Sequence, residues 1–342
     1  MGRILLALLL CLVAAGAFAQ QRLRIDVGSV PALSSGPLYI AKEKGYFAAA
    51  GLDVEIQHFP SSSDMAALVA TGRLPIIGGA LSAGFFNSVE KQIPVKLILS
   101  RNTTPAYNIL MLRADLVGTV KTAADLKGRT LALLARGSVI NYQAGKILES
   151  GGLTLKDVEQ KFMPFPQIAI AFQNKAIDAG IMIPPLSEIV AAQGIAVKFI
   201  DSDDAIKVHP VLVSVKQVNT NWAAANPKAV RDFIHADLRA TRDYCNAYHH
   251  APNRPEIVAI LAKYTDVKDP AQIEKMEWGA RDPYGRIFEE SMMDIQDFFF
   301  KEGLIGKKFT PKDLADSTYL DEANKKLGPF TLAVSSQKRG CR

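Results

Sequence analysis

Apolar and polar positions along this chain follow two patterns that alternate. The runs "LRIDVGS", "LDVEIQHF" and "PVKLILS" are typical of β-strands. The segments between them, "SGPLYIAKEKGYFAAAG" and "SDMAALVATG", are typical of helices, and each ends at a glycine, Gly51 or Gly72, that suits the left-handed position after a helix. This alternation predicts an α/β fold with a mostly parallel, doubly wound sheet.

The same order of elements occurs a second time from residue 121 onward. The stretch "AALVATGRLPIIGGALS" resembles "AIAFQNKAIDAGIMIPP", and "IPVKLIL" resembles "IAVKFID", at a separation of about a hundred residues. A repeated helix, short strand, small-residue loop, helix and strand predicts two similar α/β lobes. The length of 342 residues agrees with two lobes, because it exceeds what one compact core usually holds.

Two further strand-like segments, residues 106–117 and 209–218, lie where the chain must change lobes. We interpret them as crossover strands, with the second lobe inserted into the first. The predicted lobe 1 contains residues 20–105 and 216–330, including C-terminal helices, and lobe 2 contains residues 106–215. The last residues, 331–342, are predicted to be a flexible tail.

The N-terminus has the pattern of a cleaved signal peptide, residues 1–19. Arg3 precedes an apolar run from Ile4 to Ala15, and "AFA" supplies the small residues at which a signal peptidase cuts. The alternative is a buried N-terminal helix. The pattern predicts an exported, periplasmic protein.

Charge and composition exclude some classes of partner. The chain is 49% hydrophobic, as is ordinary for a globular protein, and without residues 1–19 it has 39 basic and 34 acidic residues, a net charge of +5. The basic residues are scattered, whereas a nucleic-acid-binding protein needs them in a stripe, so no nucleic acid is expected as a partner. Cys245 and Cys341 remain after cleavage and could pair outside the cytoplasm. We favour a buried apolar role for Cys245 and a loose tail thiol for Cys341.

Four loops before helices are rich in small residues and serine: "PALSSGP", "PSSSD" (60–64), "GGALS" (78–82) and "RGSVIN" (136–141). In a doubly wound sheet, such loops lie at the carboxyl ends of the strands, where ligands bind. The free N–H groups at helix N-termini bind anions and other acceptors, and small residues leave them room. Serine is also the usual helix cap, so the prediction of a ligand site between the lobes depends on the recurrence of the pattern.

At this point the chain resembles a known family. The segments "GPLYIAKEKGYFAAAGLDVEI", "SSSDMAALVATGRL", "TAADLKGRTLAL", "AFQNKAIDAGI" and "RDPYGRIFEESMMDIQDFFFKEGLI" are similar to the solute-binding proteins of ATP-binding-cassette (ABC) importers, in the branch of nitrate-, sulfonate- and taurine-binding and NMT1/THI5-like proteins. The resemblance implies a type II periplasmic-binding-protein fold, with two crossover strands and a ligand at the hinge. Pro75 and Lys175 depart from the family pattern, and no motif indicates one substrate.

The resemblance also implies partners and alternatives. An importer component captures a small anionic or heterocyclic solute by hinge closure, delivers it to an inner-membrane permease, and acts as a monomer without a cofactor. One alternative is a cytosolic relative, an enzyme that makes the thiamine pyrimidine from its own histidine and bound pyridoxal phosphate. This chain lacks that relative's Cys-rich iron-binding motif and has no zinc, nucleophile-elbow or phosphate-loop motif. A further alternative is a sensor that hands its liganded state to a membrane receptor.

Candidate ligand contacts follow from the loops and from neighbouring segments. Arg101 could clamp a carboxylate or sulfonate, or be a surface residue of a hinge loop. Glu188 could bind an amine, or cap its helix. Trp278, Arg281, Asp282 and Tyr284 are expected at the rim of the ligand cleft, or in a structural turn. The predicted ligand-binding residues are Ser34, Ser35, Ser61, Ser62, Ser63, Leu81, Ser82, Arg101, Asn102, Ser138, Val139, Pro184, Glu188 and Asp282.

Overall fold

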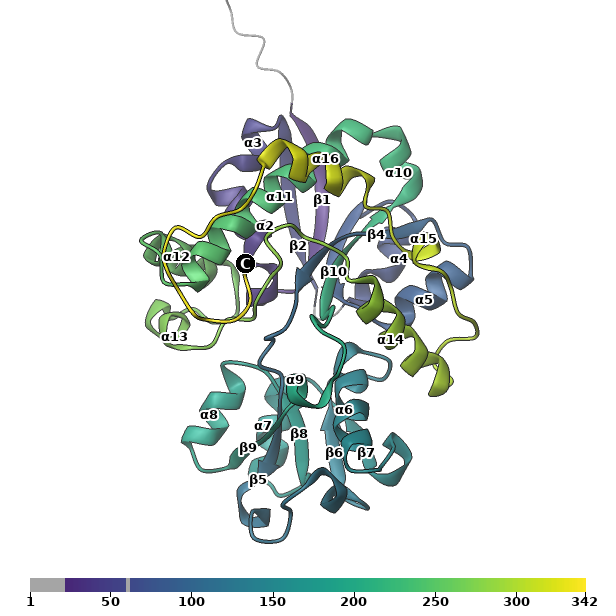
Figure 1. Ribbon diagram of the computed structural model, residues 1–342, viewed down its shortest axis with the longest axis vertical. Coiled ribbons are helices and arrows are strands. Elements are labelled where there is room, and N and C mark those ends of the chain that lie inside the picture. The colour runs from purple at the N-terminus through teal and green to yellow at the C-terminus, as the bar shows by residue number, and fades with distance from the viewer. Residues whose placement is uncertain (1–21, 60–61) are drawn as a thin grey trace, which may run out of the picture.

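Two α/β lobes lie one above the other along the long axis of the molecule (Figure 1). The structure is a computed structural model, and it describes residues 22–59 and 62–342. The predicted signal peptide lies outside the described residues. Each lobe is built on a five-stranded sheet, with the order β2-β1-β3-β10-β4 in the first and β7-β6-β8-β5-β9 in the second. The prediction of two α/β lobes is confirmed.

The strands of the first sheet are β1 (Leu23–Ser29), β2 (Leu52–His58), β3 (Ile76–Ala80), β4 (Val95–Asn102) and β10 (Ser214–Asn219). Those of the second sheet are β5 (Ile109–Arg113), β6 (Thr130–Leu133), β7 (Glu159–Phe162), β8 (Ala179–Met182) and β9 (Ala196–Asp201). The helices around the first sheet are α2 (Gly36–Glu43), α3 (Tyr46–Ala49), α4 (Ala66–Ala70), α5 (Ala83–Glu90), α10 (Thr220–Ala225), α11 (Pro227–Tyr248), α12 (Arg254–Tyr264), α13 (Pro270–Lys275), α14 (Glu289–Lys301), α15 (Pro311–Leu314) and α16 (Thr318–Leu327). The helices of the second lobe are α6 (Val139–Ser150), α7 (Phe165–Gln173), α8 (Leu186–Ala192) and α9 (Ser202–Ala205).

The two sheets have the same arrangement, which agrees with the repeat in the sequence. In each, three neighbouring strands are parallel: β2-β1-β3 and β7-β6-β8. The fourth position is taken by a strand that enters from the other lobe, β10 or β5, and that strand is antiparallel to both of its neighbours. The parallel strands end at the lobe boundary, so a strand that enters there runs the opposite way. Four strands of each sheet therefore run in one direction, as the expected mostly parallel sheet requires, and the strand from the other lobe is the antiparallel exception.

The two predicted crossover strands are present, as the strands that follow the connectors between the lobes. The strand-like residues of 106–117 and 209–218 lie mainly in β5 and β10, which belong to the sheets. The chain passes between the lobes in the two connectors before these strands, and the connectors contact each other. Val211 N–H donates to the Thr104 hydroxyl at 3.2 Å, and that hydroxyl also bonds His209 Nδ1 at 3.2 Å.

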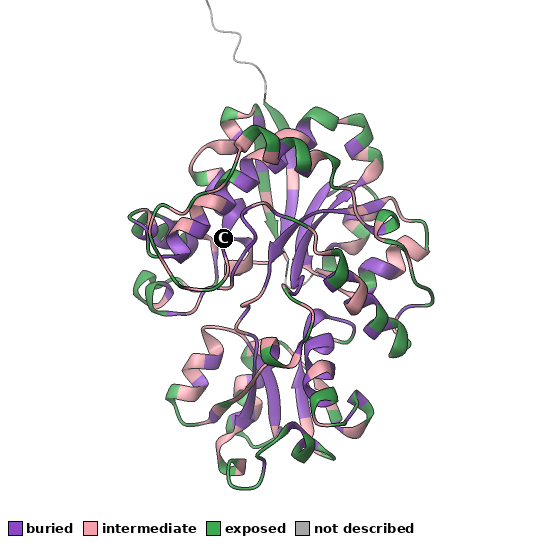
Figure 2. Cartoon of the chain, viewed as in Figure 1, coloured by how far each residue is buried: buried purple, intermediate pink, exposed green. Residues whose placement is uncertain are grey.

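The apolar core is continuous from one lobe to the other near α6 and α14. Figure 2 shows buried residues along both sheets and on the inner faces of the helices. One buried cluster contains Phe86 and Leu97 from the first lobe together with Leu110 and Tyr142 from the second. The long helix α11 packs on α2, α12 and α16 in a separate cluster of the first lobe. Among the described residues, no helix is both long and apolar enough to cross a membrane.

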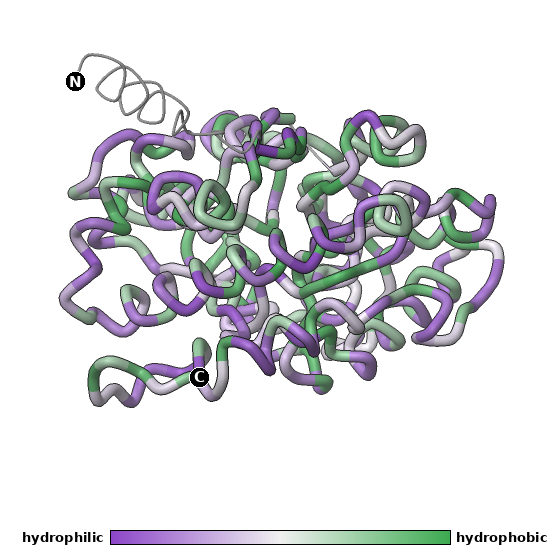
Figure 3. The backbone as a smooth tube through the Cα atoms, turned by 90° about the horizontal axis from the view of Figure 1, so that it is seen from above, coloured by the Kyte–Doolittle hydropathy of each residue, from purple (hydrophilic) through white to green (hydrophobic). Residues whose placement is uncertain are grey.

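The thiol of Cys341 was predicted to be loose, at the end of a flexible tail of residues 331–342, and the burial of Cys341 contradicts the loose thiol. Cys341 is only 1% exposed and lies against Cys245 of α11. The C-terminus lies over the first lobe, between the labels of α12 and α2 in Figure 1, and near one edge of the molecule in the view from above in Figure 3. The tail lacks helix and strand patterns, so a local sequence pattern does not reveal its contacts with α11.

Candidate functional site at the boundary of the lobes

Two of the serine-containing loops meet where the lobes face each other. The loop "GGALS" leads into α5, and "RGSVIN" leads into α6. The first amide of α5, Ala83 N–H, donates to Gly137 O of the other lobe at 2.8 Å. Ser82 and Ser138 occupy the N-cap positions of the two helices. The carboxyl ends of β3 and β6 thus lie at one boundary, as the doubly wound topology requires.

The hydroxyl of Ser35, in the loop "PALSSGP", is the centre of a group of hydrogen bonds. It lies 2.7 Å from the Ser29 hydroxyl and 2.5 Å from Val30 O, and it accepts from the Arg101 guanidinium at 2.5 Å. Ser35 is only 1% exposed, so its hydroxyl is occupied by neighbouring residues of the first lobe. Sequence reasoning missed Ser29, because it is the last residue of a strand and the serine-rich loop begins after it.

Arg101 extends from β4 across the sheet to β3. A Cβ atom on Gly78 would lie 2.9 Å from the guanidinium carbon, so the absence of a side chain there makes room for the arginine. Arg101 is 5% exposed, which contradicts the alternative of a surface residue. Within residues 22–59 and 62–342 it makes no ion pair with a carboxylate. A buried charge normally has such a partner, because the loss of hydration is costly.

Two more buried cations surround Arg101. The Arg281 guanidinium donates to the carbonyls of Arg101 and, at 2.7 Å, Leu33. Lys216 forms an ion pair with Asp237 inside the sheet–helix interface. Burial, together with the charge of Arg281, lowers the pKa of Arg101 to about 10. Burial lowers the pKa of Lys216 to about 8, although Asp237 opposes that shift. The buried carboxylate of Asp237 lies among these basic side chains and pairs with Lys216.

The other predicted residues of the first lobe lie in two kinds of place: in the serine-rich loops, or against the connector before β10. Ser34 lies half-buried in the short 3₁₀ helix Leu33–Ser35, and Ser62 packs against Gly79. Ser63 begins the 3₁₀ helix Ser63–Met65, and Ser61 lies outside the described residues. Leu81 is fully buried and its amide donates to Val213 O at 3.3 Å, while the carbonyl of Asn102 accepts from Val213 N at 3.1 Å. Leu81 and Asn102 therefore hold the connector in place.

In the second lobe, the predicted residues lie at two helix starts. The Ser138 hydroxyl donates to Ala135 O and accepts from Asn141 N, and Val139 is the buried first residue of α6. Pro184 is half-buried just before α8. Glu188 does not cap α8 as the simpler alternative expected: its carboxylate accepts from the amide of Glu277 in the first lobe at 3.4 Å. It thus connects the two lobes.

The segment expected at the rim of the ligand cleft is a structural turn. Both carboxylate oxygens of Asp282 bind Arg286, which occupies them within the first lobe. Trp278 is 1% exposed, its Nε1–H donates to Ile273 O at 2.8 Å, and its ring lies against Tyr244. This contradicts a rim position for Trp278, because the "EWGARDPYG" segment packs beneath α11. Among the described residues, no group of three or more His, Cys, Asp or Glu could hold a metal ion.

Comparisons with known proteins agree with this arrangement. The family model described as "NMT1/THI5 like" matches residues 33–250. The chain is 25% identical over 229 residues to the riboflavin-binding protein RibY of Chloroflexus aurantiacus. This alignment covers 65% of this chain and 62% of RibY. It is 24% identical over 321 residues to a putative aliphatic sulfonates-binding protein of Bacillus subtilis, which covers 89% of each.

The fold matches that of solved periplasmic binding proteins. The nitrate-binding protein NrtA from Synechocystis PCC 6803 superposes with a TM-score of 0.71 at 17% identity, covering 90% of this chain and 89% of that one. The chain matches 62% of the length of RibY, which is less than two thirds of that relative. The family model covers well over half of the chain. This chain belongs to the NMT1/THI5-like family and has the periplasmic-binding-protein fold.

Proposed function

We propose that this protein is the exported solute-binding component of an ABC importer, that it captures a small solute with an anionic group between its lobes, and that it delivers the solute to a permease. The observation that carries the proposal is Arg101, a buried guanidinium at the carboxyl end of a strand with no carboxylate partner among the described residues. An anionic group bound there would supply the missing counter-charge.

The surroundings of Arg101 support an anion over a neutral ligand. Arg281 adds a second guanidinium, while the carboxylate of Asp237 already pairs with Lys216. The N-termini of α5 and α6 lie at the same boundary between the lobes, and their free backbone N–H groups add partial positive charge there. Relatives that are named for sulfonate and nitrate binding are consistent with this chemistry, whereas another relative is named for the binding of riboflavin, a heterocycle.

Capture requires the lobes to move apart and close again. The two connectors are short and hydrogen-bond to each other through Thr104, so they are suited to bend together. In the structure, Ala83 N–H of the first lobe contacts Gly137 O of the second. A ligand between these loops would replace or extend that contact. We expect the ligand-bound protein to be more compact in small-angle scattering than the ligand-free protein.

A thermal-shift screen tests the substrate class. We expect sulfonates, carboxylates or nitrate to raise the melting temperature of the purified protein, since a ligand that binds only the folded state stabilises it. Pyrimidines and riboflavin serve as neutral comparisons. A shift with neutral compounds alone would contradict the anion proposal.

Replacement of Arg101 by methionine tests the residue itself. We expect R101M to weaken binding of the anion by about 10- to 100-fold, because a charge-assisted hydrogen bond is lost. The ligand-free variant should remain at least as stable as the parent, since it loses an uncompensated buried charge. The control is R24M, at a mainly exposed arginine of β1. Undiminished affinity in R101M would overturn the assignment.

Two alternatives make different predictions. A pyrimidine-precursor enzyme would bind pyridoxal phosphate and change its absorbance, which we do not expect here. A sensor partner would bind the same solute but support no uptake. Permease and ATPase genes next to this one, and loss of solute uptake when this gene is deleted, would favour import.

A further inference from the structure

We propose that Cys245 and Cys341 form a disulfide that fastens the C-terminal strap, residues 331–342, to α11 and thereby holds the Arg281 segment against a connector between the lobes. In the cell this proposal rests on the export stated above, because a cytoplasm keeps thiols reduced. The purified protein allows a test that does not depend on export.

The two sulfur atoms are in direct contact inside the first lobe. Cys245 is fully buried on α11 and Cys341 is 1% exposed, and the two Sγ atoms lie 2.6 Å apart. The backbone at Gly340 and Cys341 is left-handed, with φ of +80° and +57°. A left-handed cysteine is uncommon, and the surrounding structure must hold it in place. This conformation directs the penultimate residue of the chain into α11.

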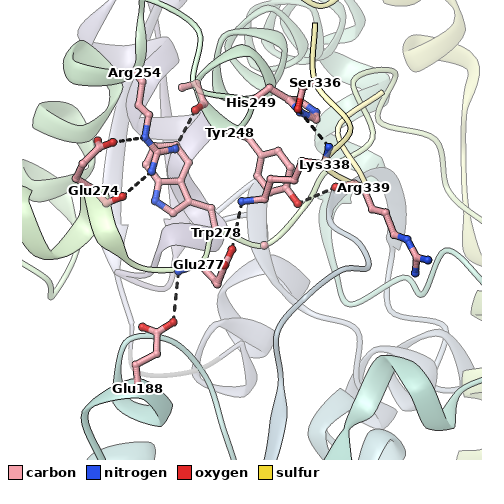
Figure 4. A network of polar contacts seen from close by, with 12 residues as sticks. Glu188, Tyr248, His249, Arg254, Glu274, Glu277, Trp278, Ser336, Lys338 and Arg339 are labelled. Carbon is pink, nitrogen blue, oxygen red and sulfur yellow. Dashed lines mark hydrogen bonds and ion pairs between the residues drawn. The ribbon is translucent and has the colours of Figure 1, made fainter. Parts of the chain in front are cut away.

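Polar contacts guide the strap along α11 before it reaches Cys341 (Figure 4). The Tyr248 hydroxyl donates to Arg339 O at 2.7 Å. His249 bonds the Ser336 hydroxyl at 2.8 Å and Gly340 O at 3.0 Å through its two ring nitrogens. Lys338 lies over the Tyr248 ring, 4.2 Å from its centre. These contacts place the two thiols in register, so a disulfide requires no large rearrangement of the strap.

The strap also contacts the segment that carries Arg281. Cys341 N–H donates to Arg281 O at 3.1 Å, next to the guanidinium that binds the carbonyls of Arg101 and Leu33. The Cα of Gly340 packs so closely on Ala280 and Pro105 that a Cβ would lie 2.3 Å from the Ala280 side chain. Ala280 N–H donates to Pro105 O at 2.8 Å, in the first connector. A covalent bond at Cys341 would therefore restrain both the cationic site and the connector.

The strap extends to the contact between the lobes as well. Lys338 forms an ion pair with Glu277 at 3.2 Å, and the amide of Glu277 donates to Glu188 of the second lobe. Figure 4 shows Lys338, Glu277 and Glu188 in succession from the strap to the second lobe. Fastening of the strap would thus favour the arrangement of the lobes in which Glu277 contacts Glu188.

The chemistry is ordinary thiol–disulfide exchange. The thiolate of one cysteine attacks an external disulfide and forms a mixed disulfide, which releases one reduced thiol. The second cysteine attacks the mixed disulfide, the intramolecular S–S bond forms, and the second reduced thiol leaves. Two protons and two electrons leave the protein, and the external disulfide is reduced. In an exported protein the oxidant is a thiol–disulfide oxidoreductase, and in the test below it is oxidised glutathione.

Alkylation and mass spectrometry test the bond. Protein produced without residues 1–19, and therefore without Cys11, is incubated with oxidised glutathione, denatured without reductant, and treated with N-ethylmaleimide. We expect no alkylation and a mass about 2 Da below that of the reduced protein. After reduction, both Cys245 and Cys341 should be alkylated. Alkylation of both thiols in the unreduced sample, or glutathione adducts that never resolve, would overturn the proposal.

Thermal melting and hydrogen exchange test the mechanical role. We expect reduction to lower the melting temperature by about 5 °C, because a crosslink across 96 residues restricts the unfolded chain. The amides of Ala280 and Cys341 should exchange faster after reduction, while Ala132 in β6 should not change. In C341S the reductant should have no effect, and K338A, which keeps both thiols, should respond to reductant as the parent does. An oxidised protein whose Ala280 exchange does not change on reduction would show that the disulfide does not restrain the connector.

Discussion

The lobes meet on two sides, and the contacts on these sides differ in kind. On the α6 side, the Phe298 ring of α14 lies so close to Gly145 that a Cβ there would be 2.2 Å from it. Asp294 of α14 accepts from Tyr142 at 2.5 Å and Lys146 at 2.9 Å. On the α8 side, a hydrogen bond of 3.4 Å joins the amide of Glu277 to the carboxylate of Glu188.

Opposite charges meet on the α6 side, whereas two carboxylates lie near each other on the α8 side. The α6 side pairs opposite charges, and Lys301 of α14 also binds Glu149 at 2.7 Å. The α8 side brings the carboxylate of Glu188 near that of Glu277, and burial, chiefly, raises the pKa of Glu188. Apolar packing with paired charges resists separation more than one long hydrogen bond does. We therefore expect the lobes to pivot near α6 and α14 and to open on the α8 side.

The largest expected effect tests the packing of the pivot. We expect G145A to lower the free energy of unfolding by about 2 kcal/mol, because its methyl group overlaps the Phe298 ring. The control is G84A in α5, where a Cβ meets only the Ser82 hydroxyl at 3.5 Å. That variant should be unchanged or gain at most about 0.5 kcal/mol from helix propensity. Urea titration measures both, and equal stability of the two variants would contradict a packed pivot.

A smaller effect tests the polar part of the pivot. We expect D294A to lose about 1–2 kcal/mol, since the hydroxyl of Tyr142 and the ammonium group of Lys146 both lose their acceptor. The matched control is D297A on the same helix, where an exposed pair with Lys308 is removed. Its cost should be below about 0.5 kcal/mol. If D297A cost as much as D294A, the position of Asp294 between the lobes would not matter.

The smallest effect on stability is expected on the α8 side. The folded-state pKa of Glu188 lies above its ordinary value of 4.5, so the contribution of Glu188 to stability is complete below that pH and is lost as the pH rises past the folded-state pKa. We expect E188Q to keep the acceptor for Glu277 N, to lack that pH dependence, and to change stability at pH 7 by less than about 0.5 kcal/mol.

Small-angle scattering tests whether the charge on Glu188 changes how compact the protein is. Ligand-free E188Q should be more compact than the parent at pH 7 and equal to it at pH 4, because only the parent gains a charge on Glu188. The D297A variant serves as the control without a change at the boundary. A parent protein as compact at pH 7 as E188Q would show that the Glu188 contact does not control opening.

The repeat and the strand signals were sufficient to predict two lobes because the hydrophobic pattern of a buried strand is local. The runs "LRIDVGS" and "PVKLILS" became β1 and most of β4. The direction of β10 was not predictable in this way, since "SVKQVN" has the same pattern whether it pairs parallel or antiparallel. The direction follows from the edge at which the chain enters the sheet.

The position of two serine-containing loops at the lobe boundary was predictable, but the contacts of their neighbours were not. Ser35 and Arg101 were selected separately, and the structure brings them into contact across 66 residues of sequence. Nothing in the sequence around Ser35 indicates that its hydroxyl is already occupied by Ser29 and Arg101. The "EWGARDPYG" segment was expected at the rim because glycine and proline break secondary structure, and such residues also occur in buried turns. Contact of any predicted residue with ligand stays a prediction.

The sequence by itself determined the family, the two α/β lobes and the loops that lie between them, because these depend on local periodicity and on the order of segments. Only the tertiary structure decided the partners of buried charges, which side of the boundary is packed, and the position of the C-terminal strap. Arg101, Glu188 and Cys341 each have their decisive neighbour far away in the chain, at Ser35, Glu277 and Cys245. Such contacts arise from the packing of the lobes, and a local pattern contains no signal for them.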